Sequence, residues 1–366
     1  MIIGLDAKRA FCTLAGLGQY SRNHLRMMVS LGQEHQFILF TPEIRMQEFL
    51  EEMKKFPNVK VVTNETSWPN WYWRSYRVAK LAEQHQVDVF HGLSNEIPRG
   101  LTMPSVVTMH DLIPFTDEAF TPIYQLWAYR GKMNYALQHA SKIVSVSHFT
   151  KNEMAKLSPK AAEKTVILSP VFQLPQIAKA EASYPLPFGN KPYLLYLGTL
   201  GPRKNLGNLL EALLHLRKKG VIVPLILAGK SLWFSDSLKE FVNNMQLGDQ
   251  VHFAGEISEA QKIQLLSQAT GLVYPSLIEG FGLPVLEALA YGKPVAVSAE
   301  SAMEEAAGQL ALTFDPRNVE EIAQQIEMLY FKPAPPSPEI WQSHVQTFSP
   351  ERLFPQWNRL YLDLKN

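Results

Sequence analysis

The sequence has a single cysteine, Cys12, among 366 residues. One cysteine can form no disulfide bond or cysteine-based metal site within the chain, which favours a reducing compartment such as the cytoplasm. No apolar run reaches about 18 residues, the length that a membrane-spanning helix needs. The chain begins Met1-Ile-Ile-Gly, without a basic segment followed by an apolar one. We therefore expect no signal peptide and a cytoplasmic protein.

The net charge is small, and common metal-binding motifs are absent. The formal net charge at pH 7 is +1, which argues against nucleic-acid binding by bulk electrostatics. Residues 1–170 carry 19 Lys and Arg against 15 Asp and Glu, whereas residues 171–366 carry 16 against 19. The sequence contains no Asp-x-Asp motif and no His-x-x-x-His cluster. We therefore expect neither a bound metal nor another cofactor.

Short apolar runs alternate with helical patterns along the whole chain. This alternation predicts an α/β fold with parallel sheets covered by helices on both faces. A chain of 366 residues, 46% of them hydrophobic, is too long for one compact core, so we expect two domains. A proline- and alanine-rich stretch over 170–192 indicates the linker. The expected strands are 2–5, 36–40, 59–63, 87–90, 105–109, 142–146 and 165–168, then 193–197, 224–228, 251–254, 271–274, 294–297 and 310–314. The expected helices include 43–55, 70–86, 120–139, 205–219, 235–246, 258–268 and 318–330, and the prolines at 333–338 are expected to break the chain.

A loop with two glycines and one acid follows the expected strand 271–274. Pro284 begins an apolar helix after this loop, and Gly292 ends it. Glycines let a backbone approach a ligand closely, and the amides at a helix start attract phosphate. Glu279 in the loop and Glu287, which we place in the first turn of the helix, can bind hydroxyls. Phosphate and hydroxyl binding together suggest a nucleotide sugar; a tight turn with dipole-stabilising glutamates is the alternative.

A second basic motif, Arg203-Lys204-Asn205, follows the expected strand 193–197. Asn205 is a favourable N-cap for the next helix. Arg203 and Lys204 would oppose the dipole of that helix unless an anion lies nearby. Arginine and lysine are also the side chains that hold phosphate. The motif therefore predicts a phosphate site, with a solvated basic turn as the alternative.

Two motifs in the first half are less specific. His110-Asp111 follows the expected strand 105–109. A histidine there can donate to a hydroxyl or a carbonyl, or it can be satisfied by neighbouring backbone. Gly16-Leu-Gly18 lacks the third glycine of a dinucleotide fingerprint. It can present amides to a diphosphate, or it can form a plain flexible turn.

The segment 68–77 contains five aromatic residues and two arginines. Aromatic side chains mixed with arginine suit a lipid interface or a surface on which sugars stack. The alternative is the core-facing side of a helix together with ordinary surface.

Together these motifs resemble the retaining glycosyltransferases of family 4, which have the GT-B fold. The resemblance rests on Glu279-x7-Glu287 with Gly280-Phe281-Gly282, Gly198-x4-Arg203-Lys204-Asn205, Gly16-x-Gly18 and His110-Asp111, in this sequence. The opening Asp6-Ala-Lys-Arg-Ala looks most like bacterial enzymes of surface-polysaccharide assembly, many of them mannosyltransferases. The resemblance implies two Rossmann-like domains facing across a cleft: an acceptor domain, 1–172, and a nucleotide-sugar donor domain, 173–345. It also implies that a C-terminal helix, 346–366, crosses back to the first domain.

The resemblance also implies a role for each motif. Glu279 would bind hydroxyls of the sugar ring, Arg203 and Lys204 would neutralise the departing diphosphate, and His110 would contact the donor sugar. Glu287 would hold the ribose hydroxyls. The remaining donor-binding positions would present backbone to sugar and phosphate; they are Gly16 and Gly18 in the first domain, and Gly198, Phe281, Gly282 and Leu283 in the second.

The implied reaction is a metal-independent hexose transfer with retention of configuration. Mannose from GDP-mannose is the favoured donor, and the acceptor is a glycan or a lipid-linked sugar of a surface polysaccharide. The alternatives are a UDP-hexose-dependent glucosyl or N-acetylhexosaminyl transferase, a UDP-sugar 2-epimerase and a non-catalytic sugar-binding protein. The aromatic segment 68–77 and the net positive first half motivate the lipid-linked acceptor and peripheral association with the inner face of the cell membrane.

Overall fold

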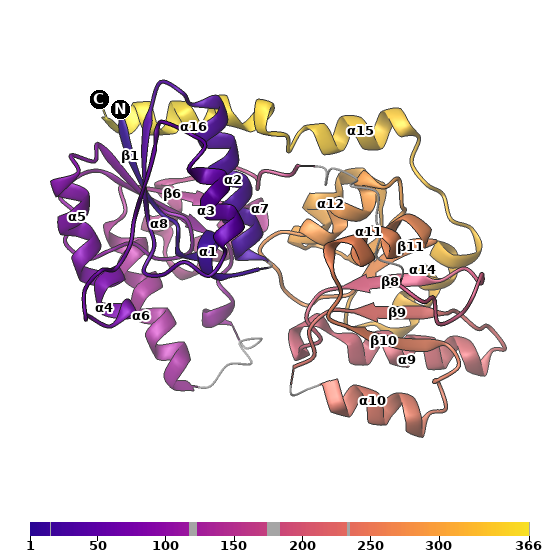
Figure 1. Ribbon diagram of the computed structural model, residues 1–366. Helices are drawn as coiled ribbons and strands as arrows, with labels where there is room; N and C mark the ends of the chain where they lie inside the picture. Colours follow the sequence, from indigo (N-terminus) through magenta and orange to yellow (C-terminus); the bar gives the residue numbers. More distant parts are fainter. Residues whose placement is uncertain (15, 117–122, 174–183, 233–234, 366) are drawn as a thin grey trace. The chain divides into compact units, whose positions relative to one another are not determined.

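The computed structural model describes residues 1–14, 16–116, 123–173, 184–232 and 235–365 (Figure 1). The chain forms two compact units. Unit 1 consists of Met1–Phe115, Thr121–Gln173 and Thr347–Asn366, and unit 2 is mainly Leu174–Gln346. Each unit contains one parallel sheet with helices packed around it.

Unit 1 contains a seven-stranded sheet in the order β3-β2-β1-β4-β5-β6-β7. All neighbouring strands are parallel. The chain moves outward in one direction from β1 and in the other from β4, so these two strands flank the topological switch point, beside which open parallel sheets bind ligands. The strands are β1 (Ile2–Asp6), β2 (Gln36–Phe40), β3 (Val59–Val62), β4 (Val89–Gly92), β5 (Ser105–Met109), β6 (Lys142–Ser145) and β7 (Thr165–Ile167).

The helices of unit 1 agree with the sequence pattern except where they are short or distorted. A single helix was expected over 70–86, but a π-helix, η1 (Trp73–Arg77), interrupts it. Helix α1 is too short for its periodicity to show in the sequence. The helices are α1 (Lys8–Cys12), α2 (Leu17–Leu31), α3 (Gln47–Met53), α4 (Asn70–Tyr72), α5 (Val78–Gln84), α6 (Ile123–His139), α7 (His148–Leu157), α8 (Pro159–Glu163) and α16 (Pro350–Lys365).

Unit 2 contains a six-stranded sheet in the order β10-β9-β8-β11-β12-β13, again all parallel. Its switch point lies between β8 and β11. The two parallel sheets confirm the predicted pair of Rossmann-like units. The strands are β8 (Leu194–Leu197), β9 (Leu225–Ala228), β10 (Val251–Gly255), β11 (Gly271–Tyr274), β12 (Val295–Ser298) and β13 (Ala311–Phe314).

The helices of unit 2 include two that the sequence analysis did not predict, α13 and α15. The prolines at 333–338 were interpreted as a break, but Pro338 is the first residue of α15, a position where proline is tolerated. The helices are α9 (Leu206–Lys218), α10 (Ser235–Asn244), α11 (Glu259–Gln268), α12 (Leu283–Ala290), α13 (Ala302–Ala307), α14 (Val319–Phe331) and α15 (Pro338–Gln346).

The C-terminal helix α16 is part of unit 1, where it packs against α2 and β4 (Figure 1). Trp357 and Tyr361 are fully buried in the core of this unit together with Leu353. The hydroxyl of Tyr361 lies 2.6 Å from Nδ1 of His91 and 3.2 Å from Nε2 of His24. The last residues of the chain thus complete a core that the first residues begin.

Replacing Trp357 with alanine should therefore destabilise unit 1 strongly. Removal of a fully buried tryptophan costs about 3–5 kcal/mol, because the cavity that it leaves closes only in part. Urea unfolding of the full chain measures the change. Arg359→Ala is the matched control on the same helix, since its side chain is 83% exposed. A loss below about 1 kcal/mol for Trp357→Ala would contradict the packing of α16 in unit 1.

Candidate active site

The loops after β8 and β11 meet at the switch point of unit 2. Arg203 and Lys204 lie on a 3₁₀ turn, Pro202–Lys204, soon after β8, and Glu279 lies between β11 and α12. β8 and β11 are neighbours in the sheet. The amide of Leu277 donates to the carbonyl of Arg203 at 2.9 Å, and Nη1 of Arg203 donates to the carbonyl of Ile278 at 3.1 Å. These bonds fix the two loops to each other.

Both predicted cations bind the predicted carboxylate. Arg203 Nη1 lies 2.7 Å from Oε2 of Glu279, and Lys204 Nζ pairs with the other oxygen, Oε1. Lys204 Nζ also donates to the hydroxyl of Tyr274 at 2.9 Å, and the lysine is only 5% exposed. Sequence reasoning missed Tyr274, although its place as the last residue of a buried strand is a signal for such a role.

The charge of Glu279 is set by this arrangement. Burial alone would raise its pKa, but Lys204 and then Arg203 outweigh burial and lower the pKa to about 2. Glu279 therefore stays ionised at neutral pH and can only accept hydrogen bonds. An ionised carboxylate beside two cations suits the binding of hydroxyls on one side and of an anion on the other. It does not suit a general acid.

Glu287 occupies a different place from the one predicted. Helix α12 begins at Leu283, so Glu287 lies in the second turn and not in the first. The side chain is 5% exposed and pairs with Lys262 Nζ of α11 at 2.7 Å. Burial alone would lower the pKa of Lys262, but Glu287 and Glu259 raise it. Sequence reasoning missed Lys262, because nothing in the sequence brings α11 next to α12.

The prediction that Asn205 caps helix α9 through its side chain is wrong. Asn205 occupies the N-cap position, but its backbone is left-handed, with φ 57°, and its side chain makes no capping bond. Its Nδ2 donates instead to the carbonyl of Pro316 at 2.6 Å. Asparagine is one of the few residues that tolerate this backbone conformation, so here the side chain joins two loops.

The predicted glycines of unit 2 lie where backbones pack closely. Gly282 precedes α12, and a Cβ at this position would lie 3.2 Å from Met303 Cα and from Ala306 Cβ of α13. Gly198 follows β8 with φ +150°, which strains other residues. Phe281 is 9% exposed, and Leu283 is the first residue of α12. The structure thus gives Gly282 a packing role in addition to any contact with a ligand.

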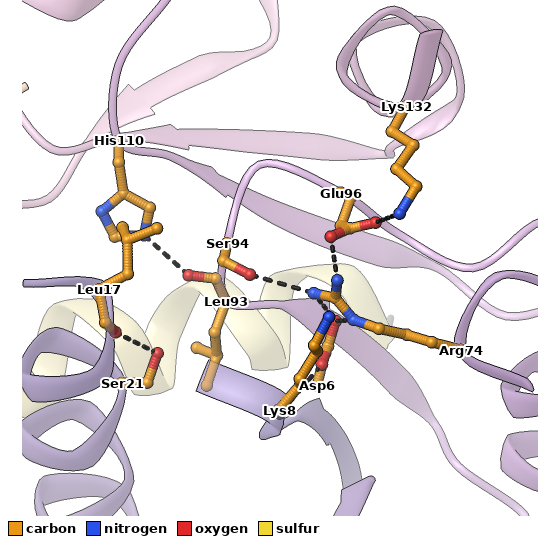
Figure 2. Close-up of polar contacts among 10 residues, drawn as sticks. All are labelled: Asp6, Lys8, Leu17, Ser21, Arg74, Leu93, Ser94, Glu96, His110 and Lys132. Carbon is orange, nitrogen blue, oxygen red and sulfur yellow. Dashed lines mark hydrogen bonds and ion pairs between the residues drawn. The ribbon is translucent and has the colours of Figure 1, made fainter. Parts of the chain in front are cut away.

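The predicted residues of the first half belong to unit 1. His110 directly follows β5, and its Nε2 lies 2.8 Å from the carbonyl oxygen of Leu93 (Figure 2). Because a carbonyl oxygen can only accept, Nε2 carries the hydrogen, and Nδ1 is left as an acceptor. The backbone amide of His110 donates to Asn95 Oδ1 at 2.7 Å. Donation to a hydroxyl was one predicted role of His110. In the structure, however, the N–H of its ring already donates to the carbonyl of Leu93.

Gly16 and Gly18 lie at the start of α2. Gly16 has φ +56° at the N-cap position. A Cβ at position 18 would lie 1.8 Å from the carbonyl oxygen of Thr13, so only glycine fits there without a shift of the backbone. The structure therefore accounts for Gly18 through a close contact with α1 and the turn after it.

The aromatic segment 68–77 is divided between core and surface. Trp73 and Arg74 are buried, at 2% and 5% exposure, whereas Trp68 and Trp71 are 50% and 61% exposed. Trp68, Tyr72 and Tyr76 form a continuous stack of rings with centroids 4.9 and 5.2 Å apart. A core-facing side together with exposed surface, one of the two interpretations of this segment, is therefore confirmed, whereas contact of the exposed rings with lipid or sugar stays a prediction.

Among the described residues there is no group of three or more His, Cys, Asp or Glu side chains that could hold a metal ion. None of the helices in the described ranges combines the length and the apolar character needed to cross a membrane.

Family models match both halves of the chain. Residues 14–171 match the model described as Glycosyltransferase Family 4, and residues 179–342 match Glycosyl transferases group 1. The chain belongs to the family 4-type glycosyltransferases. The resemblance to this family that the sequence motifs indicated is thereby confirmed for both halves of the chain.

Several curated relatives are mannosyltransferases. O-antigen chain mannosyltransferase B of Escherichia coli is 31% identical over 251 residues, 65% of this glycosyltransferase and 64% of the relative. O-antigen chain mannosyltransferase RfbU of Salmonella typhimurium is 29% identical over 253 residues, 66% of each chain. The chain thus spans slightly less than two thirds of the length of these relatives.

Solved structures resemble this glycosyltransferase over its whole length. HepE from Anabaena, crystallised in complex with UDP and glucose, has a TM-score of 0.70 at 19% identity and covers 99% of each chain. Sucrose-phosphate synthase from Thermosynechococcus elongatus has a TM-score of 0.76 at 18% identity, covering 100% of this chain and 99% of its own. At such identities the likeness establishes the fold, which agrees with the predicted GT-B class.

A buried polar network surrounds His110 in unit 1. His91 Nε2 lies 2.8 Å from Thr108 Oγ1, and this oxygen lies 3.3 Å from the hydroxyl of Tyr20. The ring of Tyr20 meets that of His110 edge-on, with centroids 4.4 Å apart. Burial lowers the pKa of His24 to about 3 and that of His110 to about 4, and it holds that of His91 well below the ordinary value.

These neutral histidines should make unit 1 sensitive to acid. An unfolded histidine takes up its proton near pH 6.5, whereas the folded His24 does so only near pH 3. Stability is therefore full above pH 6.5 and falls as the pH drops from 6.5 toward 4. Each such histidine contributes a slope of about 1.4 kcal/mol per pH unit.

Urea unfolding across this pH range measures the slope. His24→Gln should reduce it by about one histidine's share, because glutamine does not titrate, whereas the exposed control His139→Gln should leave it unchanged. An unchanged slope in His24→Gln would contradict a neutral, buried His24.

Proposed function

We propose that this glycosyltransferase moves a hexose from a nucleotide sugar to a glycan or lipid-linked acceptor, with retention of configuration and without a metal. The single observation that supports this most is the carboxylate of Glu279, ionised and held by Lys204 and Arg203 at the switch point of unit 2. The site offers an acceptor for sugar hydroxyls directly beside two cations for a diphosphate. The group that suits the sugar and the groups that suit the diphosphate of a nucleotide-sugar donor are thus in direct contact with each other.

Donor binding would redistribute the contacts of Glu279. In the free protein its two carboxylate oxygens form ion pairs with Lys204 and Arg203. A diphosphate brings oxygens that attract the same cations, and this frees lone pairs of Glu279 for sugar hydroxyls. As the bond between sugar and phosphate breaks, negative charge grows on the leaving diphosphate, where fixed cations stabilise it most. We place no protein nucleophile in this step and infer that the acceptor attacks from the face that the diphosphate leaves.

Other predicted groups would also contact the donor. Glu287 is held by Lys262, and its carboxylate suits the hydroxyls of a ribose. Pro284 in the first turn of α12 has no amide hydrogen, so the backbone of Phe281, Gly282 and Leu283 would supply the donors to sugar and phosphate. His110 of unit 1 has its Nδ1 lone pair available as an acceptor, which suits a hydroxyl of the donor sugar.

For the donor we propose GDP-mannose. The support comes from the curated relatives, which are mannosyltransferases of O-antigen chains. A UDP-hexose is the second candidate, because HepE was crystallised with UDP and glucose. The acceptor that follows from the relatives is a sugar of a surface polysaccharide.

We further propose that the protein works in the cytoplasm, at the inner face of the cell membrane. The exposed rings of Trp68, Trp71 and Tyr76 support this, since Trp and Tyr side chains favour the interface between lipid and water. A lipid-linked acceptor would be presented at that surface.

Glu279→Ala should slow transfer about 10²–10³-fold, because loss of a group that stabilises the transition state costs about 2–4 kcal/mol. Initial rates with saturating donor and acceptor measure the effect. Glu153→Ala is the control, since Glu153 pairs only with the exposed Lys156 three residues away among the contacts described. Near-normal transfer by Glu279→Ala would refute the role given to this carboxylate.

A panel of GDP- and UDP-sugars tests the donor and the reaction together. GDP-mannose should raise the melting temperature of the full chain most, and GDP should be released when acceptor is added, with or without EDTA. If only UDP-hexoses raise the melting temperature, the donor is a UDP-hexose and not GDP-mannose. Inversion at C2 of the sugar would indicate an epimerase, and binding without turnover would indicate a sugar-binding protein. Loss of activity in EDTA would refute the metal-independent mechanism.

A further inference from the structure

The core of unit 1 contains polar side chains for which the proposed reaction has no use. His24 of α2, His91 of β4, Thr108 of β5 and Tyr361 of α16 are all fully buried. Burial of polar groups costs free energy unless hydrogen bonds compensate for it. A buried cluster whose members are hydrogen-bonded to one another makes the core around it rigid. This cluster is therefore a candidate for fixing the position of a neighbouring functional group.

The hydroxyl of Tyr361 lies between two histidine rings. It is 2.6 Å from Nδ1 of His91 and 3.2 Å from Nε2 of His24. An O–H donor usually lies about 2.5–3.0 Å from its acceptor, and an N–H donor about 2.7–3.2 Å. The shorter distance therefore indicates that Tyr361 donates to His91. Since Tyr361 has only one hydroxyl hydrogen, His24 must be the donor to Tyr361.

The other ring nitrogen of His24 supports the same direction. Its Nδ1 is buried and has no hydrogen-bond partner among the residues that the structure describes. Buried N–H groups are left without a partner less often than buried acceptors are, so the hydrogen of His24 belongs on Nε2. Burial lowers the pKa of His24 to about 3 and holds that of His91 well below its ordinary value. Each ring is thus neutral at pH 7 and carries one hydrogen.

The hydrogen bonds continue from His91 to Tyr20 of α2. Because Nδ1 of His91 accepts from Tyr361, the hydrogen of His91 is on Nε2, which lies 2.8 Å from Thr108 Oγ1. Thr108 Oγ1 also lies 3.3 Å from the hydroxyl of Tyr20. We name this series of side chains, Tyr361, His91, Thr108 and Tyr20, the hydrogen-bond relay. It joins α16 to α2 through two neighbouring strands of the sheet.

The hydrogen-bond relay ends at a ring that packs against His110. The ring of Tyr20 meets that of His110 edge-on, with centroids 4.4 Å apart. The contact with Thr108 fixes the tilt of the Tyr20 ring, and this ring limits how the ring of His110 can turn. Nε2 of His110 is fixed by its bond to the carbonyl of Leu93 at 2.8 Å (Figure 2). The direction of the remaining ring nitrogen, Nδ1, follows from these two contacts.

We propose that the hydrogen-bond relay positions His110, and that the C-terminal helix α16 thereby takes part in catalysis through Tyr361. This proposal rests on the proposed function, in which Nδ1 of His110 accepts a hydroxyl of the donor sugar. A hydrogen bond weakens steeply when its geometry is poor, and a misplacement of about 1 Å that arises far from the chemistry can cost about 10²-fold in rate. The relay holds the Nδ1 lone pair in one direction.

The alternative is that these side chains only dock α16 in the core. They would then contribute to the stability of unit 1 and leave the ring of His110 unaffected. Stability alone cannot distinguish the two roles, so the test must observe the histidine rings themselves.

The histidine tautomers of the full chain can be measured directly. We would label the ring nitrogens with 15N and record their long-range correlations to ring protons at neutral pH, without any substrate. His24, His91 and His110 should each carry their hydrogen on Nε2. A hydrogen on Nδ1 of His91 would reverse the direction of the relay and would overturn the proposal.

Two variants break the hydrogen-bond relay and keep the shape of the side chain. Tyr361→Phe and Thr108→Val should each change the ring signals of His110. Each should also lower kcat about tenfold, with a smaller change in KM for the donor. The double variant should lower kcat no further than one variant alone, because both changes break the same relay.

Thr165→Val is the matched control. Thr165 is a buried threonine of β7, 5% exposed, and its hydroxyl donates to the carbonyl of Ala161, outside the relay. This variant loses a buried hydroxyl as Thr108→Val does, and it should leave the His110 signals and kcat unchanged. Urea unfolding of each variant shows that the measurements are made on folded protein.

Three further results would overturn the proposal: unchanged His110 signals in both Tyr361→Phe and Thr108→Val, kcat equal to that of the wild type in both, or effects that Thr165→Val reproduces. The spectra require no substrate and therefore separate this proposal from the transfer reaction. A donor panel without turnover, together with altered His110 signals in Tyr361→Phe, would refute the proposed transfer and leave the positioning of His110 standing. Turnover with unaltered signals would refute only the positioning.

Discussion

Glu279 can remain charged inside unit 2 only because Lys204 and Arg203 bind its two oxygens. An unpaired buried carboxylate would cost several kcal/mol and would take up a proton instead. The same contacts join the loop after β8 to the loop after β11, so the shape of the switch point depends on them. Glu96 in unit 1 meets the same requirement with Arg74 and Lys132. In both units a pair of cations makes a fixed, ionised hydrogen-bond acceptor out of a buried glutamate.

This requirement couples the stability of the site to its function. In the free protein the cations of unit 2 are occupied by Glu279, and a diphosphate must compete with that carboxylate for them. Donor affinity is therefore the difference between two sets of ion pairs, both inside the same partly buried site. Such competition limits how tightly the donor binds, and it leaves more of the interaction for the leaving group, where charge increases during the reaction.

The sequence was sufficient to predict most of the fold, because buried parallel strands appear as short apolar runs. It also drew attention to Arg203, Lys204 and Glu279, since the loops that follow such runs lie at the carboxyl edge of a sheet. The burial of Arg74 could not be predicted from the sequence, because it depends on a π-helix and on a contact with Asp6, which is distant in the sequence. The predictions for the helical turn of Glu287 and for the capping role of Asn205 were wrong for a related reason. Both depend on where a helix begins and on contacts that only the folded chain provides.

The most direct test is an experimental structure of the chain with an intact nucleotide sugar. We predict that Arg203 and Lys204 bind oxygens of the diphosphate and that a hydroxyl of the sugar donates to the carboxylate of Glu279. A donor bound with its diphosphate away from both cations, while Arg203 and Lys204 still pair with Glu279 alone, would contradict the central claim.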